Sequence, residues 1–143
     1  MNLTRFSDYS LRVLIIAGTY PDRLLTIAEI ASTYDISENH LMKVVHRLAQ
    51  LGLLDTVRGK GGGLRLARQP ADINLGWVVR QSEQGQPLVE CFDQVHAHCK
   101  IAPACRLKNM LHQAEEAFYT VLDQFTLADV LERKTELARL IPI

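Results

Sequence analysis

Two helix-capping signals lie close together in this sequence, and a glycine-rich segment follows them, which restricts the folds that the chain can adopt. Thr26 precedes an apolar segment at 27–35, and Glu29 completes a Thr-x-x-Glu capping box. Ser37 then caps a second segment, 38–52, with apolar residues at helical spacing. Two short helices joined by a tight turn are typical of a helix-turn-helix. The alternative is an ordinary pair of helices with a solvated polar face.

The first turn of the second predicted helix carries polar side chains that suit base recognition. Asn39 can pair with adenine, Glu38 can accept a hydrogen bond from cytosine, and Lys43 can reach a phosphate or a guanine. We therefore expect this helix to enter the major groove of double-stranded DNA. The candidate residues are Ser37, Glu38, Asn39, His40 and Lys43.

The next segment predicts a β-hairpin of the kind called a wing. Two strand-like runs, 53–57 and 63–67, are separated by a glycine-rich tip with two cations. Arg58 can enter a narrow minor groove, Gly59 lets the backbone come close to the duplex, and Lys60 can neutralise a phosphate. The alternative, a nucleotide-phosphate cradle, lacks a Gly-Lys-Ser/Thr ending and a following amphipathic helix.

Three cysteines, Cys91, Cys99 and Cys105, lie in or beside a stretch with little periodic structure at 82–103. A loop this long usually has a function, and a bound cofactor would supply one. An odd, clustered set of thiols suits a metal or iron-sulfur site better than a disulfide framework.

Other chemistry is open to the same cysteines. His96 and His98 lie just before Cys99, close enough to allow a Cys3His zinc site. Cys105 with a histidine could form a nucleophile pair in an enzyme, but no oxyanion loop or third orienting group accompanies these residues. We therefore expect no enzymatic activity.

Charge and composition are compatible with a DNA-binding protein, although they do not by themselves indicate one. Residues 1–70 hold nine Lys or Arg against six Asp or Glu, whereas residues 71–143 hold seven against ten, so the predicted DNA-binding half is the basic one. The first residues lack a basic region followed by an apolar core, and no stretch has the roughly eighteen apolar residues of a membrane span. We expect a cytoplasmic protein, in which reducing conditions disfavour disulfides.

The flanking segments predict packing and dimerisation helices. Residues 3–19 have mostly helical spacing, residues 73–79 read as the edge of a helix or as a short strand with Trp77 in the core, and Thr126 caps a last amphipathic segment. From residue 104 an apolar stripe suits a two-fold dimer seam, as is usual for helix-turn-helix proteins. The stripe consists of Leu107, Met110, Leu111, Ala114, Ala117, Phe118, Val121, Leu122 and Phe125.

The predicted fold is therefore mainly α: a winged helix-turn-helix with a small β-hairpin wing and a long C-terminal dimerisation helix. We expect a winged DNA-binding domain at 1–80, a cysteine-containing loop at 81–105, and a dimerisation helix with a C-terminal segment at 104–143.

Nearly the whole chain resembles the NsrR and IscR branch of the Rrf-type winged-helix repressors. The motifs that carry the resemblance are Leu-Thr-x-Phe-x-Asp-Tyr at 3–9, Arg-Gly-Lys-Gly-Gly-Gly at 58–63, Ile-Ala-Pro-Ala-Cys-Arg-Leu at 101–107 and Leu-Ala-Asp at 127–129. Two departures matter. The spacing from Cys91 to Cys99 is longer than is usual in the family, and Lys108 stands where the IscR type has a histidine. The second departure favours the NsrR type.

That resemblance implies a dimeric repressor that binds an iron-sulfur cluster and releases its operator in response to nitric oxide. The cluster would be 4Fe-4S, or alternatively 2Fe-2S, held by the three cysteines and by Asp8 from the partner subunit. Arg12 lies one turn after Asp8 and could orient it by an ion pair. His96 and His98 are competing ligands, and a helix-capping role is the alternative for Asp8. A response to iron-sulfur supply or redox state is the alternative function.

Overall fold

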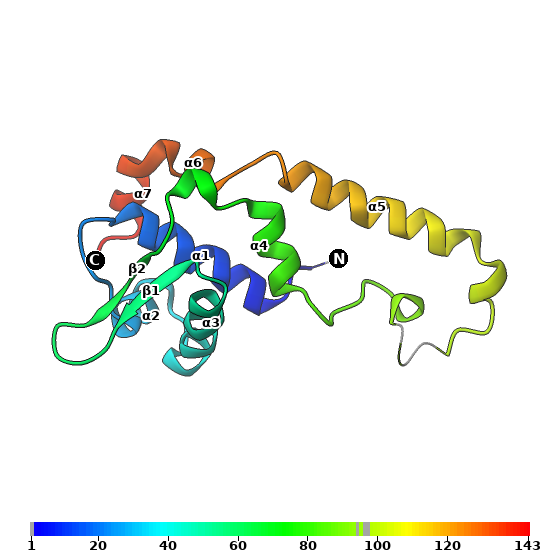
Figure 1. Cartoon of the computed structure of the whole chain (residues 1–143), viewed down its shortest axis with the longest axis horizontal. Coiled ribbons are helices and arrows are strands. Elements are labelled where there is room, and N and C mark those ends of the chain that lie inside the picture. Colours follow the sequence, from blue (N-terminus) through cyan, green and yellow to red (C-terminus); the bar gives the residue numbers. More distant parts are fainter. Residues whose placement is uncertain (1, 94, 96–97) are drawn as a thin grey trace.

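Helices dominate the architecture, and one antiparallel hairpin projects from them (Figure 1). The computed structural model describes residues 2–93, 95 and 98–143. The predicted winged helix-turn-helix is confirmed. The elements are α1 (Arg5–Thr19), α2 (Ile27–Tyr34), α3 (Glu38–Gln50), β1 (Leu54–Val57), β2 (Gly63–Leu66), α4 (Leu75–Ser82), α5 (Arg106–Leu122), α6 (Leu127–Val130) and α7 (Lys134–Leu140), with short 3-10 turns at Pro70–Asp72, Glu90–Phe92, Ala102–Ala104 and Leu131–Arg133.

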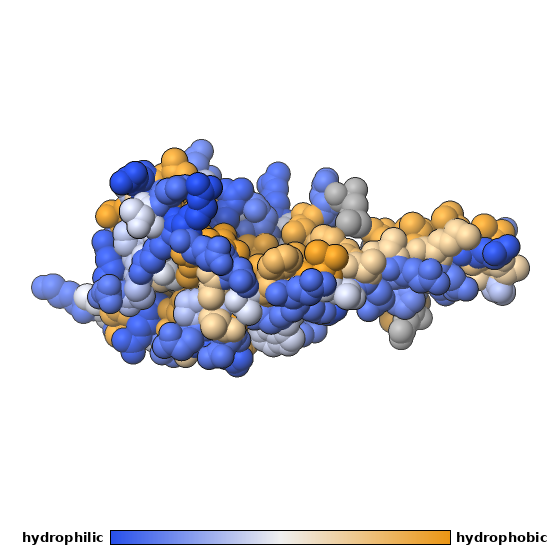
Figure 2. All heavy atoms as spheres, turned by 90° about the horizontal axis from the view of Figure 1, so that it is seen from above, coloured by the Kyte–Doolittle hydropathy of each residue, from blue (hydrophilic) through white to orange (hydrophobic). Residues whose placement is uncertain are grey.

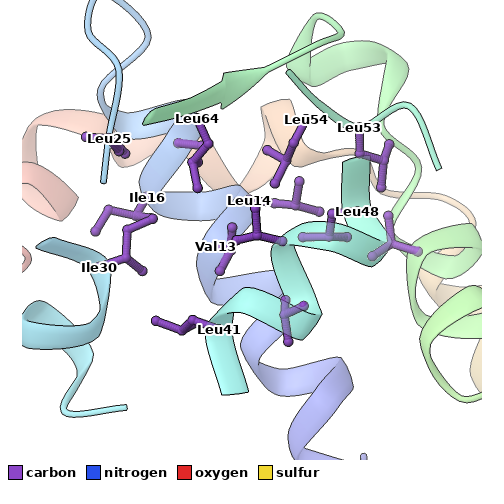
Figure 3. Close-up of a cluster of buried hydrophobic side chains, with 14 of the residues drawn as sticks. Val13, Leu14, Ile16, Leu25, Ile30, Leu41, Leu48, Leu53, Leu54 and Leu64 are labelled. Carbon is purple, nitrogen blue, oxygen red and sulfur yellow. The ribbon is translucent and has the colours of Figure 1, made fainter. Parts of the chain in front are cut away.

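Helix α1 lies in the middle of the core. Its residues Val13, Leu14 and Ile16 are fully buried, and Figure 3 shows them among side chains from α2, α3 and the hairpin. Helix α1 contacts α3, α4, β2, α6 and α7. A helix surrounded in this way holds the other elements together by the burial of its apolar surface.

Both helices of the helix-turn-helix begin where the sequence predicts, and they end one and two residues earlier than predicted, at Tyr34 and Gln50. Thr26 and Glu29 form a reciprocal capping box on α2, and the Ser37 hydroxyl accepts a hydrogen bond from the backbone N–H of His40 at 3.2 Å on α3. Between the helices, Asp35 adopts a left-handed conformation (φ 53°), which an aspartate tolerates better than most residues. Ile36 is buried directly after it, so the turn is anchored to the core.

The expectation that Trp77 belongs to the core is wrong. Residues 73–79 enter helix α4, and on that helix Gly76, Val78 and Val79 are the buried residues. Trp77 lies on another face and is 36% exposed. The helical spacing of α4 explains the difference, because neighbouring residues on a helix point in different directions.

The chain after α5 returns to the winged domain. Leu127 of α6 is fully buried in the same core as α1, and its backbone N–H donates to the carbonyl of Ile73 at 2.9 Å. The Tyr20 hydroxyl donates to the carbonyl of Ile141 at 3.0 Å, beyond the end of α7. Among the described residues, no helix is long and apolar enough to cross a membrane.

The capping box of α2 gives a stability prediction. Thr26→Ala removes the hydroxyl that accepts the N–H of Glu29 at 3.2 Å, and we expect the free energy of unfolding to fall by about 1 kcal/mol. The backbone N–H of Thr26 lowers the pKa of the Glu29 carboxyl, so the box stabilises at neutral pH and is lost as pH falls through that lowered pKa.

Urea unfolding at neutral pH measures this effect. The matched control is Thr135→Ala, which removes an exposed hydroxyl from α7. Equal losses in the two variants would contradict the capping assignment.

Candidate DNA-binding face and cysteine loop

Helix α3 separates a buried apolar face from an exposed polar one. Its four buried side chains face the core. The five DNA-contacting residues predicted for the start of this helix are all exposed: Ser37, Glu38, Asn39, His40 and Lys43. The His40 ring lies 6.3 Å from the Tyr9 ring of α1, so it stands at the edge of this face nearest α1. The polar face therefore has the geometry that a groove-reading helix needs.

The wing has the predicted strands and a tip shaped by glycine. Strands β1 and β2 pair in antiparallel register, with Leu54 opposite Leu66 and Val57 opposite Gly63. Gly59 and Gly61 have positive φ angles of 95° and 76°, which glycine adopts at little cost. A short bridge ties the hairpin to the segment before α2, because Leu25 and Leu64 exchange backbone hydrogen bonds.

The tip cations are free to meet an external anion. Arg58 and Lys60 are exposed, and within the described chain neither makes an ion pair. By contrast, Arg65 of β2 faces Asp55 of β1 across the ladder, with Nε 3.8 Å from Oδ2. Unpaired positive charge thus concentrates at the tip of the hairpin.

Arg68 belongs to this region, and the sequence analysis missed it. Its Nε donates to the carbonyl of Gly52 at 3.0 Å, just beyond the C-terminal end of α3. A cation at a helix C-terminus interacts favourably with the helix dipole and with the unpaired carbonyls there. Arg68 therefore ties the strand that leaves the wing to the helix that precedes it. No sequence signal marks this contact, because it joins residues 52 and 68 through the hairpin.

Asp8 lies on the first turns of α1 and is paired as predicted. Arg12 Nη2 is 3.0 Å from Asp8 Oδ2, and Arg12 Nε donates to Asp8 Oδ1 at 3.1 Å. Asp8 is not the helix cap: Thr4 is, because its hydroxyl accepts the N–H of Ser7 at 3.2 Å. The capping alternative for Asp8 is therefore wrong, and Arg12 holds its half-exposed carboxylate.

Glu83 is the second residue that the sequence analysis missed. It follows α4 directly, and its carboxylate Oε1 accepts hydrogen bonds from the backbone N–H of Thr4 at 2.8 Å and from the Thr4 hydroxyl at 2.9 Å. The hydroxyl of Ser7, which is fully buried, donates to the same oxygen. A carboxylate at a helix N-terminus satisfies donors that the helix leaves unpaired. Glu83 thus fixes the end of α1 that carries Asp8 to the start of the cysteine loop.

The three cysteines are free thiols of intermediate exposure. Cys91 lies in the turn Glu90–Phe92, the carbonyl of Cys99 accepts the N–H of Ala102 at 3.2 Å, and Cys105 directly precedes α5. In the described part of the chain, no three His, Cys, Asp or Glu side chains come close enough together to hold a metal ion.

The donor chemistry nevertheless fits an iron-sulfur cluster, since three unpaired thiols lie on one loop and thiolates are the usual ligands of such clusters. His98 is exposed, and its backbone N–H donates to Glu90 Oε1 at 2.9 Å. His96, the other candidate histidine, lies outside the described residues.

Helix α5 projects from the winged domain with an apolar stripe (Figures 1 and 2). All of α5 is described, and none of its residues is buried. Leu107, Met110 and Val121 are 58%, 54% and 54% exposed. Such a stripe on a projecting helix is typical of a surface that another protein covers.

Residues 3–133 match the Rrf2 family, described as iron-dependent transcriptional regulators. The chain is 50% identical over 142 residues to the HTH-type transcriptional regulator NsrR of Bacillus subtilis (strain 168), covering 99% of this chain and 97% of that protein. It is 45% identical over 144 residues to the HTH-type transcriptional regulator NsrR of Halalkalibacterium halodurans, covering 100% and 99%.

Solved structures have the same fold. The structure of T. potens IscR superposes with a TM-score of 0.72 at 24% identity, covering 93% of this chain and 88% of that one. The structure of CymR, the global cysteine regulator of B. subtilis, superposes with a TM-score of 0.69 at 25% identity, covering 91% and 95%.

The Glu83 contact gives a prediction for the N-terminal end of α1. Glu83→Ala leaves the donors of Thr4 and the buried Ser7 without their shared acceptor, and we expect the free energy of unfolding to fall by about 1–3 kcal/mol. Amide hydrogen exchange in the first turn of α1 should accelerate as well. The control is Gln86→Ala, an exposed neighbour. If the two variants have the same stability and the same exchange in α1, Glu83 does not hold this helix.

Proposed function

This chain belongs to the Rrf2 family of transcriptional regulators, and from that premise we propose that it is a homodimeric repressor. Its operator binding depends on an iron-sulfur cluster and is relieved by nitric oxide. The observation that carries the proposal is the combination, in one chain, of an exposed polar face on α3 beside an unpaired cationic wing and a loop with three free thiols.

The DNA contacts follow from what α3 and the wing expose. Asn39 and Glu38 offer amide and carboxylate groups to base edges in the major groove, and Ser37 and His40 offer shorter polar contacts beside them. Lys43, one turn further along α3, reaches a phosphate or a guanine. Base contacts of this kind supply specificity, whereas contacts to phosphate fix the register of the protein on the duplex.

The wing supplies contacts that depend less on sequence. Arg58 inserts into the minor groove, Gly59 allows the backbone to approach, and Lys60 neutralises a phosphate. Because the hairpin is tied to α3 through Arg68 and Gly52, helix and wing dock as one unit.

Cys91, Cys99 and Cys105 would hold the cluster, with Asp8 of the partner subunit as the fourth ligand of a 4Fe-4S centre. When bound, this group supplies iron that reacts with nitric oxide. Arg12 orients the Asp8 carboxylate through two contacts. An oxygen ligand among sulfur ligands is a weak point in such a set, so Asp8 is the contact most easily lost.

The two subunits would meet along the apolar stripe of α5. A symmetric dimer places two recognition helices at half-sites about 34 Å apart, one turn of the DNA duplex. Loss of the Asp8 contact between subunits would let the cysteine loop, which joins α4 to α5, change the relation between the winged domains. The dimer would then no longer match its half-sites, and DNA would be released.

Anaerobic purification followed by iron and sulfide analysis tests the proposed cofactor. We expect about four irons per subunit and a visible absorbance that changes when nitric oxide is added. The same addition should release a DNA duplex selected by the protein from a random-sequence pool. Asp8→Ala should keep the dimer and make the cluster more labile, whereas Asp22→Ala, an exposed aspartate, should change neither.

Several outcomes would contradict the proposal. Zinc in place of iron would assign the loop a structural metal, and iron without a response to nitric oxide would favour a sensor of iron-sulfur supply or redox state. A cluster with unchanged lability in the Asp8→Ala protein would remove Asp8 as a ligand.

The wing gives a separate prediction. Arg58→Ala should weaken binding to every selected duplex by a similar factor and reduce the slope of affinity against salt concentration by about one, because one phosphate-region contact is lost. The control is Arg139→Ala, which removes an exposed cation from α7. Unchanged affinity at low and high salt would show that the wing does not touch DNA.

A further inference from the structure

Helix α5 is attached to the winged domain by a cluster of polar contacts at its C-terminal end. Arg80 of α4 forms a two-pronged ion pair with Asp123, directly after α5: Nη1 lies 2.6 Å from Oδ1 and Nη2 lies 2.8 Å from Oδ2. The Arg80 guanidinium also lies 4.6 Å from the centre of the Tyr119 ring. Hydrogen bonds from Arg80 lower the pKa of the Asp123 carboxyl, so the pair is charged at neutral pH.

The backbone is held at the same point. Asn74 Nδ2 donates to the carbonyl of Asp123 at 2.7 Å, and the N–H of Leu75 donates to the carbonyl of Phe125 at 3.0 Å. The helices come so close that a Cβ on Gly76 would lie 2.1 Å from Asp123 Oδ1. These contacts fix where α5 ends but do not by themselves fix the direction in which it projects.

The direction of α5 depends on a second contact point along the helix. Tyr119 lies one turn before Asp123, so both residues lie on one face of the chain as it leaves α5. Arg80 contacts both of them. Two contacts a turn apart, made by one planar guanidinium, define the line of the helix axis relative to α4.

A small rotation at this junction has a large effect at the other end of α5. The helix has 17 residues, none of them buried. Beyond the junction, the Phe92 ring of the cysteine loop packs against the His112 ring of α5, with the ring centroids 5.8 Å apart. At 1.5 Å per residue α5 is about 25 Å long, and a rotation of about 10° would displace its far end by about 4 Å. Figure 1 shows α5 projecting from the winged domain, with its C-terminal end beside α4.

We propose that Arg80 and Asp123, together with Tyr119, are positioning residues for operator recognition: they set the angle between α5 and the winged domain, and thereby the spacing of the two recognition helices. The inference rests on the dimer of the proposed function. Both side chains of the ion pair are more than a third exposed, 36% and 39%, and exposed pairs contribute little to stability. The pair therefore acts on geometry more than on folding.

The test measures the preference of the protein for half-site spacing. The probes are the selected duplex, derivatives with one base pair inserted or removed between the half-sites, and a duplex with one half-site. Anaerobically purified Arg80→Gln and Asp123→Asn dimers should bind the selected spacing about tenfold more weakly and discriminate less among spacings. Affinity for the single half-site should stay unchanged, because α3 and the wing are intact.

Two further variants test whether the effect depends on the geometry of this ion pair. Arg80→Lys keeps a positive charge beside Asp123 without the two-pronged geometry and should retain part of the spacing preference. Glu136→Gln breaks the exposed pair between Arg133 and Glu136, whose N–O distance is 3.1 Å, and should leave the preference unchanged.

The contrary results distinguish failure of the positioning role from failure of the proposed function. Variant dimers with the wild-type spacing preference, an equal loss of single half-site affinity, or the same loss in Arg80→Lys as in Arg80→Gln would overturn the positioning role while leaving the proposed repressor function in place. A wild-type protein that is monomeric, or that binds without any spacing preference, would overturn both.

Discussion

The burial of helix α1 is the interaction on which the rest of this structure depends. The helix contacts α3, α4, strand β2 of the hairpin, and the C-terminal helices α6 and α7. Fully burying a side chain such as Leu14 or Ile16 contributes roughly 1.5–3 kcal/mol relative to leaving it exposed. No other element has so many neighbours, so the positions of the recognition helix and the wing both follow from their packing on α1.

The same helix links the core to the start of the cysteine loop. Its N-terminal end, with Thr4 and Ser7, is fixed by Glu83 at the start of the cysteine loop, and Asp8 follows within the next turn. A movement of the loop would therefore act first on the N-terminal end of a rigid, buried helix. That arrangement suits a regulator, because a rigid element transmits a displacement that a flexible one would absorb.

Helix α5, unlike α1, projects from the packed domain. It has 17 residues against the 15 of α1, but none of them is fully buried, and its polar attachment to the winged domain centres on Arg80 and Asp123. The chain therefore has two parts: a packed winged domain, and a projecting helix whose apolar stripe is exposed. The two parts meet at a polar junction, which can change angle without exposing a core.

The sequence by itself determined the local structure. The caps at Thr26 and Ser37, the glycine-rich tip between β1 and β2, and the ion pair of Asp8 with Arg12 are set by residues within a few positions of each other, so their patterns predict them directly. The fold class and the exposed polar face of α3 follow from the same short-range periodicity. Only the tertiary structure decided that Trp77 faces outward, that Thr4 and Glu83 meet, and that Arg80 pairs with Asp123. The contacts of Glu83 and Arg80 join residues 79 and 43 positions apart, and no local propensity encodes which distant segments will pack together once α1 is buried.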